Sequence, residues 1–150
     1  MDRVGQVIDG KYELIRLLGA GGMGAVYEAR HVVIHRRCAV KFLHPEVARN
    51  EEMARRFVQE AQAAAAVGHK GIIDIYDVGL TADGTAYLVM EFLDGVSLAD
   101  RLKGNRKLTP GAAAEAAVQA LAALAFAHRR GVVHRDLKPD NLYLTDQPGL

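Results

Sequence analysis

The sequence holds a single cysteine, Cys38, so no disulfide can form within the chain. One free thiol is typical of a protein kept in a reducing cytosol. An excess of either charge is also lacking, because 19 Lys and Arg against 18 Asp and Glu leave a formal net charge of +1. This balance gives no reason to expect nucleic acid or an anionic membrane as a partner.

Long uninterrupted apolar runs are missing as well. The first residues lack the apolar core of a signal peptide. The longest apolar region, residues 112–127, is interrupted by Glu115 and Gln119, so we interpret it as a buried helix and not as a membrane segment. Half of the residues are hydrophobic and a quarter are charged, which is ordinary for a folded domain. The composition predicts a soluble, cytoplasmic chain.

The residues with the clearest chemistry lie together in the octapeptide 134–141, His-Arg-Asp-Leu-Lys-Pro-Asp-Asn. Asp136 can accept a proton from an attacking hydroxyl, and Lys138 can neutralise a transferring phosphate. Asn141 has an amide oxygen that can ligate magnesium. Pro139 cannot continue a helix and restricts the residue before it, which predicts a fixed loop. An ordinary charged surface turn would explain a lone Asp-x-Lys, but hardly eight residues in this order.

This octapeptide resembles the catalytic loop of protein kinases, H-R-D-L-x-x-x-N. Lys138 is typical of the serine/threonine branch, since tyrosine kinases usually carry other residues there. Small-molecule phosphotransferases share the aspartate and the asparagine, but usually not Arg135 and Lys138. The resemblance implies ATP and Mg²⁺ as cofactors and a protein hydroxyl as substrate. Asp136 and Lys138 would then be catalytic and Asn141 a metal ligand.

A glycine-rich segment stands between two predicted strands, residues 12–18 and 25–30. Glycines let backbone N–H groups approach phosphates without side chains intervening. Dinucleotide-binding folds open a helix after the same G-x-G-x-x-G pattern, whereas Val26 and Tyr27 favour a strand. A plain glycine hairpin without a ligand is the alternative. The resemblance implies that ATP contacts this segment through Leu18, Gly19, Ala20, Gly21, Gly22, Met23, Gly24 and Val26.

One lysine, Lys41, lies in the apolar strand predicted for residues 38–43. Alone it would be interpreted as an exposed residue on a strand face. The segment resembles the V-A-I-K strand of kinases, whose lysine pairs with the α- and β-phosphates. The resemblance also implies that Ala39 and Val26 enclose the adenine.

Residues 51–67 have the composition of a helix, which Gly68 would end. As a single residue, Glu60 would be a solvated helix charge. Given Lys41, it resembles the helix-C glutamate that pairs with the strand lysine in active kinases. The helix should bury one stripe, at Phe57, Ala61 and Ala64.

Residues 72–79 and 85–92 are predicted as two further strands. The glycine break at Gly95 resembles the kinase hinge, which implies that Glu91 and Leu93 hold adenine through their backbone, with Met90 at the back of the pocket. The wording of residues 60–65 and 90–91 resembles bacterial serine/threonine kinases in particular.

Beyond the hinge the sequence becomes helical. Ser97 and Thr109 are predicted N-caps of helices 98–103 and 110–130. The second helix is apolar on most sides, and we expect it to expose an apolar patch and to make the C-terminal part loosely packed or self-associating. A short strand at residues 142–144 is expected to lack a pairing strand.

Tyr143 lies where kinases commonly carry a smaller apolar residue beneath adenine. It would stack there, crowd the pocket, or turn outward. No Asp-Phe-Gly follows Asn141 in the sequence, so a second magnesium ligand and the peptide-binding helices are not in this chain. We expect the chain alone to be inactive or very weak. The alternative function is a non-catalytic remnant that binds a nucleotide or a partner protein.

The fold class implied is α+β and protein-kinase-like. Residues 1–93 would form an N-lobe with a five-stranded antiparallel sheet and helix C. Residues 94–150 would form part of a mostly helical C-lobe that includes the catalytic loop. The partners implied are ATP and a protein substrate that the sequence does not identify, with no nucleic acid and no membrane segment.

Overall fold

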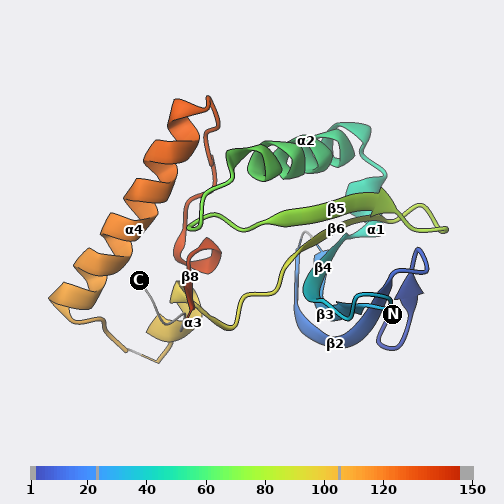
Figure 1. Ribbon diagram of the computed structural model, residues 1–150, viewed down its shortest axis with the longest axis horizontal. Helices are drawn as coiled ribbons and strands as arrows, with labels where there is room; N and C mark the ends of the chain where they lie inside the picture. The colour runs from blue at the N-terminus through green and yellow to red at the C-terminus, as the bar shows by residue number, and fades with distance from the viewer. Residues whose placement is uncertain (1–2, 23, 105, 146–150) are drawn as a thin grey trace. The chain divides into compact units, whose positions relative to one another are not determined.

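The computed structural model describes residues 3–22, 24–104 and 106–145 (Figure 1). It divides the chain into two compact units, Met1–Ala66 with Ile73–Phe92 and Val67–Ile72 with Leu93–Leu150. The segment Val67–Ile72 therefore belongs to the second unit, although it precedes the last two strands of the first unit in sequence.

The first unit is built on a six-stranded antiparallel sheet with strand order β1-β2-β3-β4-β6-β5, which curls strongly at β2–β4 (Figure 1). All five predicted strands are present, and a two-residue strand is added at one edge. The strands are β1 (Val7–Ile8), β2 (Tyr12–Gly21), β3 (Gly24–His31), β4 (Arg37–Leu43), β5 (Ile75–Leu80) and β6 (Ala86–Glu91).

Strand β5 begins three residues later than predicted. The residues before it form a turn in which Ile72 N donates to His69 O at 2.8 Å and Gly71 N donates to His69 Nδ1 at 2.9 Å. This local hydrogen bonding competes with strand pairing, which the apolar pair Ile72 and Ile73 had favoured in the sequence.

One face of the sheet carries the core of the first unit, where Leu14, Val40 and Val89 are each at most 1% exposed. Three tyrosines are buried there, Tyr12, Tyr27 and Tyr87. The hydroxyls of Tyr12 and Tyr87 donate to carboxylates, as is usual for buried polar groups. Tyr87 donates to Asp9, and Tyr12 donates to Asp77 Oδ2 at 3.0 Å. Burial and the bond to the Asp77 carboxylate raise the pKa of Tyr12 to about 12.

Two helices interrupt the strands of the first unit, α1 (Pro45–Ala48) and α2 (Glu51–Val67). Helix α2 has the predicted bounds. At its start, Asn50 Oδ1 accepts from the N–H groups of the second and third helical residues at 3.1 and 3.2 Å. Gly68 ends it with a φ of 61°, which a glycine adopts without strain. Of the predicted stripe, Ala61 is buried and the other two residues are half-buried.

The second unit holds both predicted N-caps. Ser97 Oγ accepts from Asp100 N at 3.0 Å, and Thr109 Oγ1 accepts from Ala112 N at 3.2 Å. Its elements are β7 (Gly95–Ser97), α3 (Leu98–Leu102), α4 (Pro110–Arg129), the 3₁₀ turn η1 (Pro139–Asn141) and β8 (Tyr143–Thr145).

The prediction that residues 142–144 would lack a pairing strand was wrong. Strand β8 pairs with β7 in antiparallel register, with Gly95 opposite Thr145 and Ser97 opposite Tyr143. The approach is close, because a Cβ at Gly95 would lie 2.1 Å from the carbonyl oxygen of Leu144. The glycine that looked like a simple break is therefore the residue that admits the pairing.

Helix α4 exposes the apolar face that its sequence predicted, and the interpretation of residues 112–127 as a buried helix was wrong. Only Ala123 and Ala127 are buried along it, whereas Val118 is 66% and Leu121 62% exposed. By length and composition this helix could cross a membrane, with a mean hydropathy of 1.3, but a core helix of a soluble protein meets the same description.

Candidate nucleotide site and catalytic loop

The glycine segment forms a tight hairpin between β2 and β3, whose last pair is Gly21 with Gly24. Strand β3 follows it and no helix does, as predicted. Gly24 is required by packing, since a Cβ there would lie 1.8 Å from Phe42 O. At Gly19, Gly21 and Gly22 a Cβ would meet nothing within 4 Å. Internal packing therefore explains one glycine and leaves the other three open to a ligand.

Of the other hairpin residues, Leu18 is 40% exposed and Ala20 is exposed. Met23 lies outside the described residues.

Four residues implicated in adenine and phosphate binding share one face of the sheet. The register places Val26 opposite Lys41, and Ala39 opposite Met90. Because side chains alternate along a strand, this face is opposite to the face of Val40 and the tyrosine core. Val26 and Lys41 are half-buried, and Ala39 is 5% exposed. The structure thus groups these predicted residues beside the glycine hairpin.

Lys41 forms no ion pair with Glu60 in the part of the chain that the structure describes. Glu60 lies exposed on α2, and Lys41 stands half-buried on β4. The pairing implied by the resemblance therefore stays a prediction.

The predicted hinge residues differ in their surroundings. Glu91 N donates to Asp74 O at 2.9 Å, and Asp74 N donates to Glu91 Oε2 at 3.0 Å. The N–H of Glu91 is thus already satisfied inside the first unit. Leu93 is half-buried and begins the second segment of the second unit.

The catalytic-loop residues converge around Asp136. Lys138 Nζ lies 3.1 Å from Asp136 Oδ2. Asn141 Nδ2 donates to both the backbone oxygen of Asp136, at 2.8 Å, and its Oδ2, at 3.1 Å. The turn η1 holds Asn141 by a bond from its N–H to Lys138 O at 3.0 Å. The fixed loop predicted from Pro139 is present.

Charge and backbone geometry both mark this loop as specialised. The hydrogen bond from Lys138, reinforced by the one from Asn141, lowers the pKa of Asp136, so the carboxylate is ionised at neutral pH. Arg135 has a φ of 64°, a left-handed conformation that costs a non-glycine residue on the order of 1 kcal/mol or more. Such strain is common at functional sites.

His134 has a structural part that the sequence did not reveal. Its Nδ1 accepts from the N–H of Asp136 at 3.2 Å. Two other histidines accept the same bond from the N–H two residues later. Val33 N donates to His31 Nδ1 at 3.2 Å, and Gly71 N donates to His69 Nδ1. A histidine that begins a turn was the signal that could have predicted it.

The residues available for magnesium are few. The amide nitrogen of Asn141 donates to Asp136, while no group among residues 3–22, 24–104 and 106–145 donates to its Oδ1. The described residues contain no group of three His, Cys, Asp or Glu side chains arranged for a metal.

Tyr143 lies on β8 opposite Ser97 and is 51% exposed. About half of the surface of this residue is therefore accessible to solvent or to a ligand.

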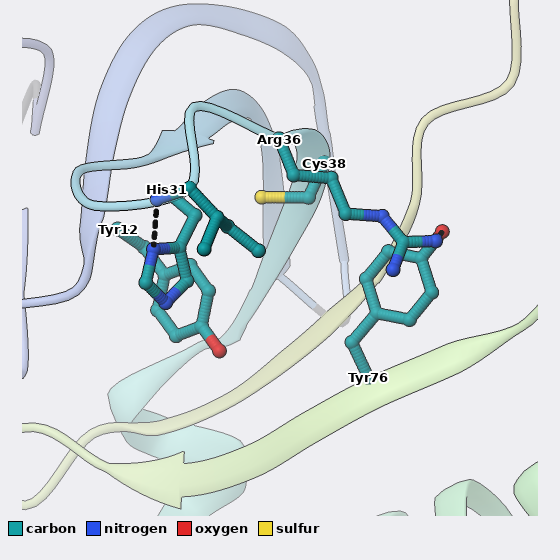
Figure 2. A pocket seen from close by; sticks show the side chains of 6 residues that line it. Tyr12, His31, Arg36, Cys38 and Tyr76 are labelled. Atoms are coloured by element: carbon teal, nitrogen blue, oxygen red, sulfur yellow. Dashed lines mark hydrogen bonds between the residues drawn. The ribbon is translucent and has the colours of Figure 1, made fainter.

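A small cavity lies on the other face of the sheet (Figure 2). Cys38 lines the cavity. Its side chain points to the face opposite to that of Lys41, because Lys41 is the third residue after Cys38 along β4 and side chains alternate. The cavity volume of about 110 Å³ is well below the 300 Å³ or more usual for ligand sites. Arg36 covers one side, with its guanidinium 3.9 Å from the ring centre of Tyr76 and a 2.6 Å bond to the ring hydroxyl. This cavity is not the nucleotide site.

A curled antiparallel sheet with a glycine hairpin and a strand lysine, together with an H-R-D loop, defines a protein-kinase-like fold. The sequence profile of the protein kinase domain family matches residues 12–149. The chain belongs to this family.

Its relatives include bacterial serine/threonine-protein kinases. PrkC of Bacillus subtilis is 38% identical over 94% of this chain, and Pkn1 of Myxococcus xanthus 45% identical over 93%. The crystal structure of the Mycobacterium tuberculosis PknI kinase domain superposes with a TM-score of 0.81 at 35% identity over 95% of this chain. The chain spans 22% and 20% of the two relatives and 57% of the solved PknI chain, so it corresponds to part of a kinase domain.

Proposed function

We propose that this chain supplies the nucleotide-binding and catalytic-loop parts of a serine/threonine protein kinase, which transfers the γ-phosphoryl group of ATP to a protein hydroxyl. The observation that carries the proposal is the arrangement of Lys138 and Asn141 around the ionised carboxylate of Asp136. Lys138 at this position is typical of kinases that act on serine and threonine.

Each residue of the loop has a defined task. Asp136 accepts the proton of the attacking hydroxyl, and its orientation is fixed by the two bonds from Asn141 Nδ2. Lys138 places a positive charge beside the reacting oxygens. Asn141 Oδ1 is the protein oxygen offered to magnesium. The metal, when bound, offsets negative charge on the phosphates.

The first unit provides the nucleotide platform. The three glycines with open space at Cβ let backbone N–H groups reach phosphate oxygens, and Lys41 adds a positive charge on the same face as Val26 and Ala39. Glu60 and the backbone of Glu91 and Leu93 remain the proposed partners of the lysine and of adenine. We place the reaction in the cytoplasm, where ATP is abundant and Cys38 stays reduced.

Thermal unfolding with and without Mg-ATP tests the nucleotide part of the proposal. At a ligand concentration ten times Kd, binding stabilises the folded state by about 1.4 kcal/mol. Lys41→Met should reduce the rise in Tm, whereas Lys70→Met, which changes an exposed lysine, should not. Equal shifts in all three proteins would contradict a role for Lys41 at the phosphates.

Phosphate transfer to a generic basic protein decides between enzyme and remnant. The assay is run on this chain and on a longer chain that adds an Asp-Phe-Gly segment. If both bind Mg-ATP but neither shows phosphate transfer that depends on Asp136, the non-catalytic alternative is favoured. If Tyr143 obstructs adenine, Tyr143→Leu should tighten binding, and unchanged affinity would exclude obstruction.

A further inference from the structure

A buried carboxylate joins three strands on the proposed nucleotide face. Glu28 of β3 is 9% exposed and is the only buried charged residue in the part of the chain that the structure describes. Arg16 Nε of β2 donates to its Oε2 at 2.7 Å, and Arg37 Nε of β4 donates to its Oε1 at 2.7 Å. We call these three residues the Glu28 clamp.

The clamp lies next to the nucleotide residues on the same face. Glu28 lies two positions after Val26, and it pairs with Ala39, which lies two positions before Lys41. Side chains two positions apart on a strand point to the same face of the sheet. Two of the three strands that it joins, β2 and β3, form the glycine hairpin. Any change in the spacing of β2 and β3 therefore displaces both the glycine hairpin and the face of the sheet that carries Val26.

The clamp also reaches the chain where it leaves the sheet. The Arg37 guanidinium lies 3.6 Å from the ring centre of Phe92, the residue that directly follows β6. A guanidinium over an aromatic face is attractive and holds both groups in a stacked geometry. Glu28 thus connects the hairpin strands, through Arg37, to the start of the segment that resembles the hinge.

Electrostatics keep this connection intact. The bond from Arg37, followed by the charges of both arginines, lowers the pKa of Glu28 against the opposing effect of burial. A buried carboxylate with both oxygens bonded is expensive to disturb, because loss of one partner leaves a buried charge partly unsatisfied.

A neighbouring pair provides the contrast. Glu13 of β2 and Arg30 of β3 are joined at 3.0 Å across the same two strands. Their side chains are 38% and 52% exposed, and their bond involves no third strand and no aromatic ring. Exposed pairs of this kind contribute little.

We propose that Glu28 is a positioning residue for nucleotide binding, which sets the spacing of the glycine hairpin and its distance from Phe92 without touching ATP. This inference rests on the function proposed above. Glu28→Gln keeps the shape but turns an amide NH₂ toward one arginine, and Glu13→Gln is the matched control.

Hydrogen exchange tests the clamp without any nucleotide. In Glu28→Gln the amides of residues 17–26 should exchange faster by on the order of tenfold, as expected for the loss of one charge-assisted hydrogen bond. Exchange in α2 should stay unchanged, which separates local positioning from general destabilisation. Glu13→Gln should match the wild type. Equal exchange at the hairpin in both variants, or equal acceleration in the hairpin and α2, would overturn the proposal.

Mg-ATP titration, well below the unfolding temperature, gives the second result. Glu28→Gln should bind on the order of tenfold more weakly, and Glu13→Gln like the wild type; equal affinities would overturn the positioning role. Absence of binding to the wild type would refute the proposed function, and the exchange result alone would then decide the clamp. If Glu28→Gln does not fold, Arg16→Gln, which leaves Glu28 bonded to Arg37, replaces it and should act in the same direction.

Discussion

The glycines of the hairpin should respond differently to the same substitution. In Gly24→Ala the new Cβ would lie 1.8 Å from Phe42 O, although real Cβ contacts below 3.0 Å essentially never occur. The obstacle is backbone, so β3 and β4 must separate by about 1 Å, and overpacking of this kind costs about 1–3 kcal/mol. For a unit of this size, that corresponds to a fall in Tm of roughly 5–20 °C.

Thermal unfolding followed by circular dichroism measures this effect. Gly21→Ala is the control, because its Cβ meets nothing within 4 Å and the stability should change by less than about 0.5 kcal/mol. The affinity for Mg-ATP should separate the two effects. Gly21→Ala should fold normally but bind Mg-ATP less tightly. A Gly24→Ala protein as stable as Gly21→Ala would refute the packing argument.

Three further predictions concern pH, association and activity. The pKa of Tyr12 is raised from 10.0 to about 12 in the folded chain. Its contribution to the free energy of unfolding, on the order of 2–3 kcal/mol, is therefore complete below pH 10 and is lost as the pH rises toward 12. Tyr12→Phe should flatten the decline of the denaturant midpoint over that range, and a decline identical to that of the wild type would contradict the prediction. The exposed apolar face of α4 should promote self-association of the chain. The double variant Val118→Gln with Leu121→Gln should therefore have a lower average mass in sedimentation. A monomeric wild type with slow, uniform hydrogen exchange in both units would refute the prediction. The chain alone should phosphorylate a basic protein very slowly or not at all, and transfer at rates usual for kinases that Asp136→Asn abolishes would show this expectation to be wrong.

Features encoded by neighbouring residues were predictable from the sequence. The caps at Ser97 and Thr109, the end of α2 at Gly68 and the fixed loop after Pro139 each depend on a few adjacent side chains. The hairpin was predictable because β-favouring residues follow its glycines directly.

Features that depend on distant segments were not predictable. Gly95 indicated only the end of the strand pattern. The close approach of Leu144, 49 positions later, shows that Gly95 allows two strands to pair. In the sequence, Glu28 is one residue of the strand predicted for residues 25–30, and only the structure shows an arginine of β2 and an arginine of β4 bonded to it. The pairing of Lys41 with Glu60 was expected from the resemblance alone and stays a prediction, because it depends on how α2 packs and not on the spacing of the two residues in the sequence.

Covalent labelling with an acyl-phosphate derivative of ATP tests whether the nucleotide binds at the glycine hairpin and Lys41, since such a reagent acylates the lysine nearest the phosphates. We expect preferential modification of Lys41, suppressed by excess Mg-ATP, with Lys11 and Lys70 modified only to the background level. Modification spread evenly over the exposed lysines, with no protection by Mg-ATP, would contradict the assignment of the hairpin and Lys41 as the nucleotide site.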